Sequence, residues 1–555
     1  MKEKLKHILH ILTPTERKQF WVQIVLNILI SIADIGALVF LLLIINFYIN
    51  NGSNPGIDLL PAWMADRESA ALIAMFFIFF SIKNFLGILI SNWQFKFIGK
   101  VAVRISKEKL DSYLAGDYSE FVNIDSAEHI RKIAFQPFEF CQHILSGIQQ
   151  IIIQAFLILI TVIAIVTFNA KLFLLLFLIL LPPVTLVFFF IKRKVSAAKK
   201  NIHSANESSI RFLLDALKGY VEGNIYQRND FFSERFAIAR QQFSKYVFTS
   251  LSVQSMPGRI IETFAVLGLF ILIVIVKWTG VNDSSTLITI GAFMASAYKI
   301  IPGIVKIINE TTQMKAYDFS IYDLYNGNNK NEADNFTRSD PIKSLELKNV
   351  SFKYKDQSIL RNLSFCINCR DFVGISGRSG RGKTTVVNLL LGFLTPDKGN
   401  ILINGNEVSP SEIKKHWPVI SYVRQQPFLI HDTILKNITL NEKQPDTPTL
   451  DQALKYSGLK DFLTDFPEGV NKLITENGKN ISGGQQQRVA IARAIYKNAD
   501  IVFLDEPFNE LDETSAISLV KYFKDLASSG KIVVMITHDS TSLSYCNKII
   551  SLDEQ

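Results

Sequence analysis

The chain has 555 residues, a net charge of +9 and a mean hydropathy of +0.21, with 48% hydrophobic residues and 42 phenylalanines. This length exceeds one ordinary domain, and the apolar content disfavours a wholly soluble protein. Lysine and arginine lie mainly beside apolar stretches, as the positive-inside rule predicts for membrane proteins, and no nucleic-acid-binding module is present. We therefore expect a bilayer and not a nucleic acid as partner.

The first 18 residues predict an amphipathic elbow helix. This stretch is polar and carries Lys2, Lys4 and Lys6, and it has leucines and isoleucines at positions 5, 8, 9, 11 and 12. We expect residues 1–18 to lie on the cytoplasmic membrane surface. No apolar core with a small-residue cleavage site follows, so a cleaved signal peptide is not expected.

Six apolar stretches predict an α-helical transmembrane domain over residues 19–320. A spanning helix needs about 20 mostly apolar residues. Pro302, in the last stretch, predicts a kink. The six stretches lie near residues 20–48, 69–93, 145–168, 172–191, 259–278 and 285–307.

The connections between these stretches predict the topology. Residues 94–144 and 192–258 are long, polar and rich in lysine and arginine, whereas the other connections are short. The positive-inside rule places the long connections and the N-terminus in the cytoplasm. We expect a multi-pass protein of the inner (plasma) membrane whose C-terminal domain is also cytoplasmic.

The C-terminal part predicts an α/β domain. Residues 321–343 are a polar linker, and residues 344–555 show short strands and amphipathic helices. Of the four cysteines, Cys366 and Cys369 form a lone CxxC without a second pair. We interpret them as structural residues and not as a zinc or redox site.

A phosphate-binding loop of the form GxxxxGK[ST] runs from Gly377 to Thr384. It follows an apolar strand and precedes an apolar helix, which is the context the motif requires. Its glycines let backbone N–H groups surround phosphates, Lys383 reaches the β- and γ-phosphates, and the Thr384 hydroxyl ligates Mg²⁺. The predicted ATP contacts in this loop are Gly377, Ser379, Gly380, Gly382, Lys383, Thr384 and Thr385.

Two carboxylates end the apolar segment that begins at Ile501. We expect Asp505 to bind Mg²⁺ and Glu506 to activate the attacking water. Strands that end in acidic residues are common, so this interpretation depends on the phosphate loop elsewhere in the chain.

A second anion-binding segment opens another predicted helix. Ser482, Gly483, Gly484 and Gln485 form a Ser-Gly-Gly helix start, whose N–H groups suit a phosphate. Because the chain already has a phosphate loop, a second such segment indicates that ATP has two protein faces.

These motifs, in this order, resemble those of the ABC transporter family. The resemblance implies four further roles: Tyr354 stacks on adenine, Gln425 contacts Mg²⁺ and the water, Asp512 contacts the partner subunit, and His538 holds the γ-phosphate. Two departures are mild. Ile481 stands where leucine is usual, and Asn509-Glu510 stands where Ser-Ala is usual.

The resemblance covers essentially the whole chain. The chain is similar to exporter-type half-transporters, in which a transmembrane domain and a P-loop ATPase domain are fused. It implies an ATP-hydrolysing translocase that works by alternating access. It also implies a homodimer, with a heterodimer as the alternative, and ATP held between Lys383 of one chain and Ser482 of the other. Short helices near residues 116–123 and 219–227 are the expected coupling segments.

The substrate is less determined by the sequence. Asp34, Lys83, Glu262 and Lys299 lie in or near the spans, where charges are costly and face a cavity or one another. Either pairing, such as Asp34 with Lys83, or contact with an anionic head group fits. We expect an amphiphile such as a lipid or lipid-linked oligosaccharide. A peptide or multidrug exporter is the alternative, and a non-transporting sensor is a further one.

Overall fold

The structure is a computed structural model. It describes residues 2–49, 70–116, 118, 125–168, 170–279, 284–326, 341–355, 357–440, 442, 444–464 and 466–553. The chain divides into two compact units: a helical unit of residues 1–116 and 124–331, and an α/β unit of residues 117–123 and 332–555.

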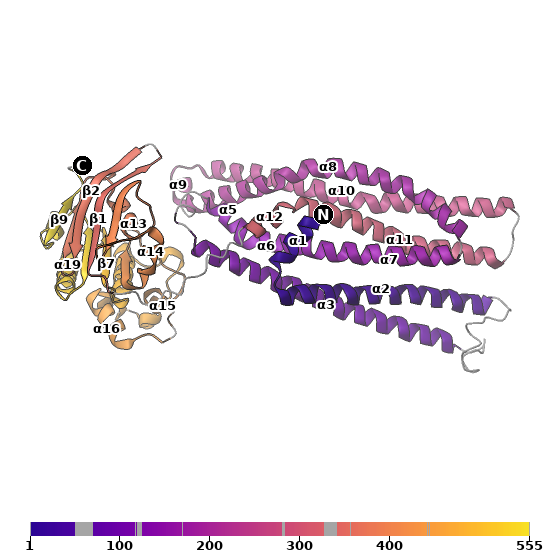
Figure 1. Ribbon diagram of the computed structural model, residues 1–555, viewed down its shortest axis with the longest axis horizontal. Helices are drawn as coiled ribbons and strands as arrows, with labels where there is room; N and C mark the ends of the chain where they lie inside the picture. Colours follow the sequence, from indigo (N-terminus) through magenta and orange to yellow (C-terminus); the bar gives the residue numbers. More distant parts are fainter. Residues whose placement is uncertain are drawn as a thin grey trace. The chain divides into compact units, whose positions relative to one another are not determined.

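The helical unit places one long helix on each of the six predicted spans (Figure 1). Among the described residues of the six stretches, these helices cover all but Ala70 and Leu145, and Leu145 ends the helical turn directly before α7. Their bounds are α2 (Pro14–Ile49), α3 (Ala71–Leu114), α7 (Ser146–Phe168), α8 (Ala170–Lys218), α10 (Asn229–Thr279) and α11 (Ser284–Ala316). The predicted fold class is thus confirmed for the helical part.

Three of the long helices extend far beyond a membrane. At about 1.5 Å per residue, the 44 residues of α3, the 49 of α8 and the 51 of α10 make each helix more than twice as long as a bilayer core of about 30 Å is thick. The long polar connections are therefore largely continuations of spanning helices. Among the residues searched, the stretches Pro14–Leu41, Ala71–Leu114 and Ser126–Thr167 are long and apolar enough to cross a membrane.

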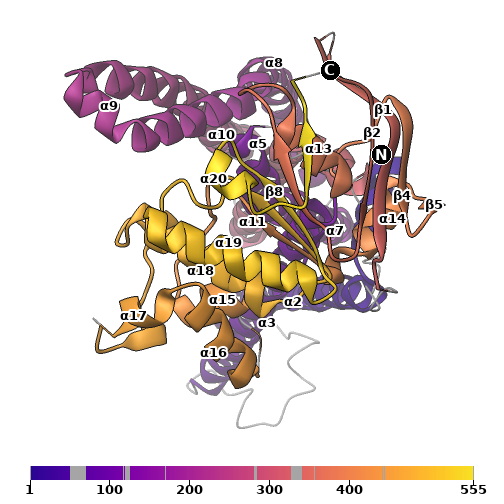
Figure 2. The ribbon, with the colours of Figure 1, turned by 90° about the vertical axis from the view of Figure 1, so that its left-hand side faces the viewer.

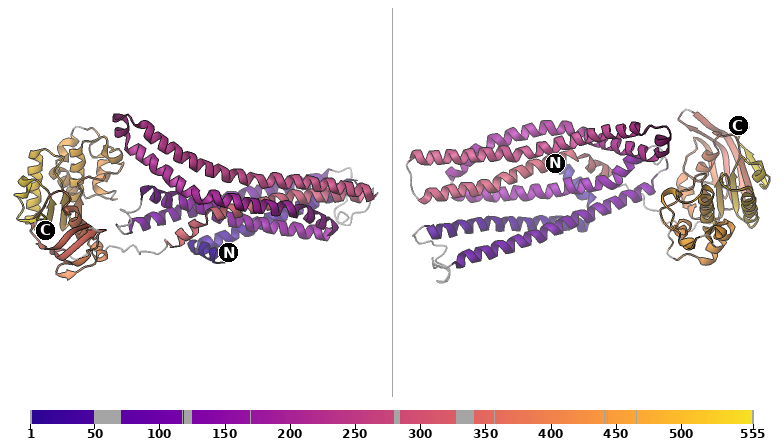
Figure 3. Two further views of the ribbon diagram at one scale, coloured as in Figure 1. Left: turned by 90° about the horizontal axis from the view of Figure 1, so that it is seen from above. Right: turned by 180° about the vertical axis from the view of Figure 1, so that it is seen from behind.

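The long helices pack in three pairs, of which α7 and α11 are far apart in sequence. Helix α8 lies along α10, α7 along α11, and α2 along α3, as two further views also show (Figure 3). Helix α11 continues through Pro302 without ending. Ahead of α7, the segment α5 (Ser126–Ile130), η1 (Arg131–Phe135), α6 (Gln136–Glu139) and η2 (Phe140–Leu145) is a continuous helix with two π-helical stretches.

The ends of the helical unit differ from the predicted bounds. Helix α1 covers Lys2–Ile11, and the first spanning helix already begins at Pro14. Helix α12 (Phe319–Asn326) occupies the start of the segment expected to be linker, and α1 packs on it through the ring of His7, which stacks on Tyr325 at 4.2 Å. Residues 327–340 of that segment lie outside the described residues.

The α/β unit contains two sheets. An antiparallel sheet has the order β2 (Gln357–Asn368), β1 (Ser344–Tyr354), β4 (Lys398–Ile403), β5 (Asn406–Glu407). A parallel sheet has the order β6 (Ile420–Val423), β7 (Ile501–Asp505), β8 (Ile532–Ile536), β3 (Phe372–Ser376), β9 (Lys548–Ser551).

The parallel sheet is buried on both faces, because alternate residues enter two different cores. Val502 and Leu504 face a core with α18 (Gly483–Tyr496) and α19 (Glu513–Ser528), which Figure 2 shows across one face. Ile501 and Phe503 face a second core, which α13 (Lys383–Leu390) and the antiparallel sheet cover. Such continuous apolar strands are typical of parallel sheets.

Phe503 is a suitable position for testing the second core, because its side chain is fully buried and its strand pairs with β6 on one side and β8 on the other. We expect Phe503→Ala to lower the free energy of unfolding by about 3–5 kcal/mol, from lost burial and the cavity left behind. The thermal midpoint of the full chain in detergent should fall. Phe428→Ala removes a ring that is 59% exposed and is the matched control; equal midpoints for the two variants would contradict this core.

Candidate functional site

The order of the parallel strands gathers most of the predicted site residues. Carboxyl ends of parallel strands meet at one edge of a sheet. Gln425 follows β6, Asp505 ends β7, His538 follows β8, and the loop 377–384 joins β3 to α13. Four neighbouring strands thus deliver the phosphate loop, two acids, an amide and an imidazole to the same edge.

The phosphate loop depends on glycine at two turns. Gly380 and Gly382 have φ of +81° and +90°, which L-residues with side chains rarely adopt. A Cβ on Gly382 would also lie 2.6 Å from Ile359 Cγ2. Lys383 Nζ donates to the carbonyls of Gly377 at 2.7 Å and Arg378 at 3.3 Å.

These bonds hold the Lys383 ammonium group against the inner side of its own loop. Thr384 is exposed at the start of α13, and Thr385 is buried beneath it.

Asp505 is nearly inaccessible, with 4% of its surface exposed. Burial raises the pKa of its carboxyl group, and a hydrogen bond from Tyr422 Oη to Oδ2, at 3.2 Å, opposes this rise. The same burial, together with the Asp505 charge, raises the pKa of the Tyr422 hydroxyl. Asp505 is therefore a recessed oxygen donor that one hydroxyl group orients.

The Glu506 carboxylate lies at the centre of a polar network. Its Oε2 accepts hydrogen bonds from Gln425 Nε2 and from Asn509 Nδ2, both at 2.8 Å, and its Oε1 lies 3.6 Å from His538 Nδ1. The Glu506 side chain is 16% exposed, whereas that of His538 is 67% exposed. The structure thus brings together three of the residues expected to carry catalysis.

The Ser-Gly-Gly segment forms a separate site on the same unit. Ser482 caps α18: its backbone N–H donates to Gln485 Oε1 at 2.9 Å, and its Oγ accepts from the Gln485 N–H at 3.2 Å. A pocket of about 590 Å³ lies over Ser482, Gly483, Gly484 and Gln485 and extends to Asp512. Residues 377–384, all of which are described, do not line it.

Asp512 caps α19 and borders this pocket. Hydrogen bonds from Thr514 and Ser515 hold the pKa of its carboxyl group well below the usual range. One oxygen also lies 3.5 Å from Arg488 Nη2.

Tyr354, the predicted adenine contact, is the last residue of β1. Its ring is 45% exposed and meets the Phe352 ring edge-on at 4.9 Å. Contact with the buried Phe352 ring therefore helps to hold the Tyr354 ring in place, while part of the Tyr354 ring remains accessible.

Sequence reasoning did not single out Tyr422 or Asn509 as site residues. Tyr422 lies in the stretch that carries Gln425, and Asn509 marks a departure from the family pattern, so both were visible in the sequence. Their contacts with Asp505 and Glu506 depend on how β6, β7 and the following turn meet in space.

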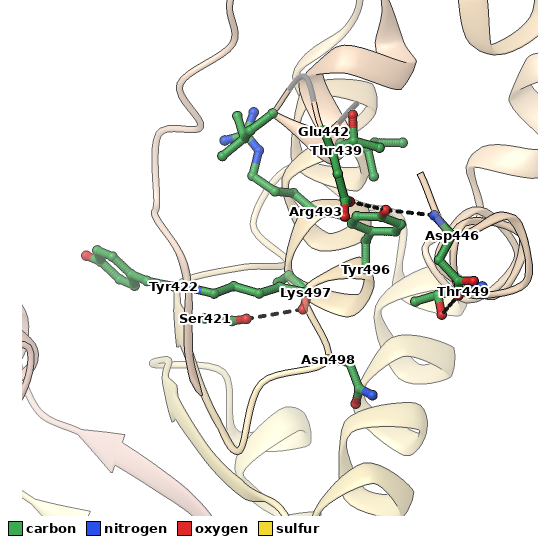
Figure 4. Close-up of a pocket in the computed structure, with 13 residues that line it drawn as sticks. Ser421, Tyr422, Thr439, Glu442, Asp446, Thr449, Arg493, Tyr496, Lys497 and Asn498 are labelled. Carbon is green, nitrogen blue, oxygen red and sulfur yellow. Dashed lines mark hydrogen bonds between the residues drawn. The ribbon is translucent and has the colours of Figure 1, made fainter. Parts of the chain in front are cut away.

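A further pocket of about 540 Å³ lies away from these motifs, between β6, the end of α15 (Ile434–Thr439) and the end of α18 (Figure 4). Tyr496 donates to Glu442 and accepts from the backbone N–H of Asp446 at 3.1 Å. Leu440, at its rim, is 60% exposed.

Lys383 offers a direct test of the phosphate loop. We expect Lys383→Ala to weaken ATP binding about tenfold or more, because the loop would lose its ammonium donor. Titration of the purified full chain with a fluorescent ATP analogue measures this. Lys398→Ala, which removes an exposed lysine of β4, should bind as the unaltered chain does. Unchanged affinity of Lys383→Ala would contradict the assignment.

Two family models match the chain. The ABC transporter transmembrane region matches residues 20–298, and the ABC transporter model matches residues 360–509. A Rickettsia bellii protein that is named an export ATP-binding/permease protein is 37% identical over 228 residues, which are 40% of this chain and 39% of the relative. An ATP-dependent lipid A-core flippase of Syntrophus aciditrophicus is 28% identical over 327 residues, or 58% of this chain and 54% of the relative.

The fold is also that of a solved structure. A bacterial Atm1-family ABC exporter with ATP bound superposes with a TM-score of 0.76, at 18% identity, over 97% of this chain and 93% of that one. The matched stretches span only about two fifths to just over half of the curated relatives above, whereas the two family models together cover most of this chain. The chain belongs to the ABC transporter family, with a membrane-embedded helical region followed by an ABC ATPase domain.

Proposed function

We propose that the protein is an ATP-hydrolysing exporter or flippase that moves an amphiphilic substrate away from the cytoplasmic side of the inner membrane. The network around Glu506, at the same sheet edge as the phosphate loop, is the observation that carries this proposal. The N-terminus and the ATPase domain then lie in the cytoplasm, as the lysine-rich connections favour.

The oxygen donors at this edge fit Mg²⁺, which prefers carboxylate, hydroxyl and carbonyl oxygens. Thr384, Asp505 and Gln425 would hold the ion. When bound, it neutralises charge on the phosphates. Lys383 binds the β- and γ-phosphates, and Tyr354 offers its exposed ring to adenine.

Glu506 is the general base in this proposal, and His538 beside it holds the γ-phosphate. Glu506 and the imidazole lie close enough to act on one water and one phosphate group. The Tyr422 hydroxyl orients the Asp505 carboxylate by donating a hydrogen bond to its Oδ2.

ATP would join two subunits. The segment Ser482–Gln485 lines a pocket without the phosphate loop, although both suit phosphate. A homodimer in which each ATP lies between Lys383 of one subunit and Ser482 of the other satisfies both anion-binding segments at once.

Two cytoplasmic segments would couple ATP binding to the spans. Helix α9 (Tyr220–Ile225) lies inside the predicted segment 219–227, and Tyr220, Val221 and Ile225 are each more than half exposed. In the segment 116–123, only Gly116 and Tyr118 are described. Tyr118, which belongs to the α/β unit, stacks on Phe393 at 4.8 Å.

The exposed apolar side chains of α9 suit a protein–protein contact. Closing of the ATPase domains would then move the spanning helices between inward-facing and outward-facing states.

An ion cluster inside the helical unit supports the proposal that the substrate has an anionic head group. Lys83 forms an ion pair with Asp34, and Lys299 Nζ lies 3.6 Å from the other oxygen of the same carboxylate. Each residue lies near the middle of its span, and Lys83 is 6% exposed. Two ammonium groups against one carboxylate leave a positive charge where an unpaired charge is costly. A phosphate or diphosphate on a lipid would compensate it.

Glu506→Gln tests the catalytic role. The amide cannot accept the proton of water, so we expect ATP hydrolysis to fall at least about 100-fold while ATP binding is retained. Phosphate release and fluorescent-nucleotide titration, both on the full chain in nanodiscs, measure the two quantities. Glu513→Gln, in the first turn of α19, is the control. Normal turnover by Glu506→Gln would remove this role.

Lys299→Gln tests the substrate class. We expect lipids with a phosphate or diphosphate head to stimulate ATPase activity in nanodiscs, and the variant to lose most of this stimulation while its basal activity remains. Lys100→Gln, an exposed lysine of α3 beyond the predicted span, should respond like the unaltered chain. Stimulation by peptides or drugs alone would favour the multidrug alternative, and no stimulation or transport at all would favour a sensor.

A further inference from the structure

The turn after β7 carries a side chain that contacts the proposed catalytic base. Asn509 and Glu510 stand where the family usually has Ser-Ala. Asn509 is exposed, yet its side chain has a defined partner: its Nδ2 donates to Glu506 Oε2 at 2.8 Å. This departure from the family pattern therefore adds a hydrogen bond to the Glu506 carboxylate.

Asn509 shares its target with the predicted Mg²⁺ and water contact. Gln425, which follows β6, donates from its Nε2 to the same Oε2 at 2.8 Å. Two amides thus occupy one carboxylate oxygen. The other oxygen, Oε1, lies 3.6 Å from His538 Nδ1.

The backbone at Glu506 makes such support useful. Glu506 has a φ of +46°, in the left-handed region, which is strained for a residue with a side chain. Its N–H donates to Ile536 O at 2.9 Å, which fixes the backbone on β8. That bond leaves the side-chain torsions free, and the two amides restrict them.

The turn that carries Asn509 is itself anchored. Phe508 is 9% exposed and packs in the core with α19, and the Leu511 N–H donates to Phe508 O at 3.0 Å. Pro507 limits the backbone before it. Asn509 is therefore presented from a fixed position and not from a loose loop.

We propose that Asn509 is a positioning residue for ATP hydrolysis: it holds Oε2 of Glu506 so that Oε1 is the oxygen that accepts the proton of the attacking water. In that step the water proton passes to Oε1, the water oxygen bonds to the γ-phosphorus, and the bond to the bridging oxygen breaks, with its electron pair leaving on ADP. The inference rests on the proposed role of Glu506 as base.

Three substitutions at position 509 separate the hydrogen bond from packing. Asn509→Ala removes the donor, Asn509→Ser restores the usual family residue with a shorter side chain, and Asn509→Asp keeps the shape but places a carboxylate against Glu506. We expect kcat to fall about 3–10-fold for alanine and serine, which corresponds to one lost hydrogen bond of ordinary net strength at an exposed position, and further for aspartate. KM and nucleotide affinity should stay within about twofold. Asn471→Ala, an exposed asparagine distant in sequence, is the control.

A double-mutant cycle decides whether Asn509 acts through Glu506. If it does, Asn509→Ala added to Glu506→Gln causes no further loss in single-turnover hydrolysis. The same fold loss in both backgrounds, an unchanged kcat for all three variants, or a parallel loss of ATP affinity would each overturn the inference. Normal turnover by Glu506→Gln alone would instead remove the proposed catalytic role, so the two failures are distinguishable.

Discussion

The order of the parallel sheet is the constraint on which the ATP site depends. β7 lies between β6 and β8, and β3 follows β8, so four carboxyl ends form one row. The register is held because successive residues of β7 enter different cores, with Phe503 on one side and Leu504 on the other. A slip by one residue would exchange both faces and would move Asp505 away from Tyr422. Burial of apolar strands therefore sets the positions of polar groups that lie outside the cores.

The helical unit solves a different problem, because a bilayer offers no water to polar groups. The backbone is satisfied within helices, and several buried polar side chains find partners on other helices. Gln149 accepts from Gln94 at 2.7 Å and donates to Gln23 at 3.1 Å, which ties three spans together. The Asp34 cluster ties α2, α3 and α11 in the same way. These contacts specify which helices are neighbours, whereas apolar surfaces alone would allow several arrangements.

Local patterns predicted much of this protein, and contacts between distant segments account for what they left open. The phosphate loop, the strand that ends at Asp505 and the helix start at Ser482 each lie within a few residues, and the structure has the expected elements there. The pairing of Asp34 with Lys83 was one of two open interpretations, because spacing along the chain does not determine which helices meet. The hydrogen bond between Asn509 and Glu506 could not be predicted from the sequence, because it depends on the geometry of the turn after β7. Helix α12 extends into the segment predicted to be linker because Ile321 and Leu324 are buried in the helical unit, a packing contact that the local sequence did not indicate.

In the proposed mechanism, the Asp34 cluster would also link the protein to the voltage across its membrane. Two ammonium groups and one carboxylate lie near the middle of the spans, so the cluster would carry a net positive charge. If access alternates as proposed, the aqueous cavity would change sides, and the electrical potential at this charge would change because the field would fall across the opposite half of the protein. One elementary charge crossing the full field corresponds to about 2.3 kcal/mol per 100 mV. An anionic cargo would cancel the charge in the loaded state, so the empty return step would be the one that senses the membrane potential.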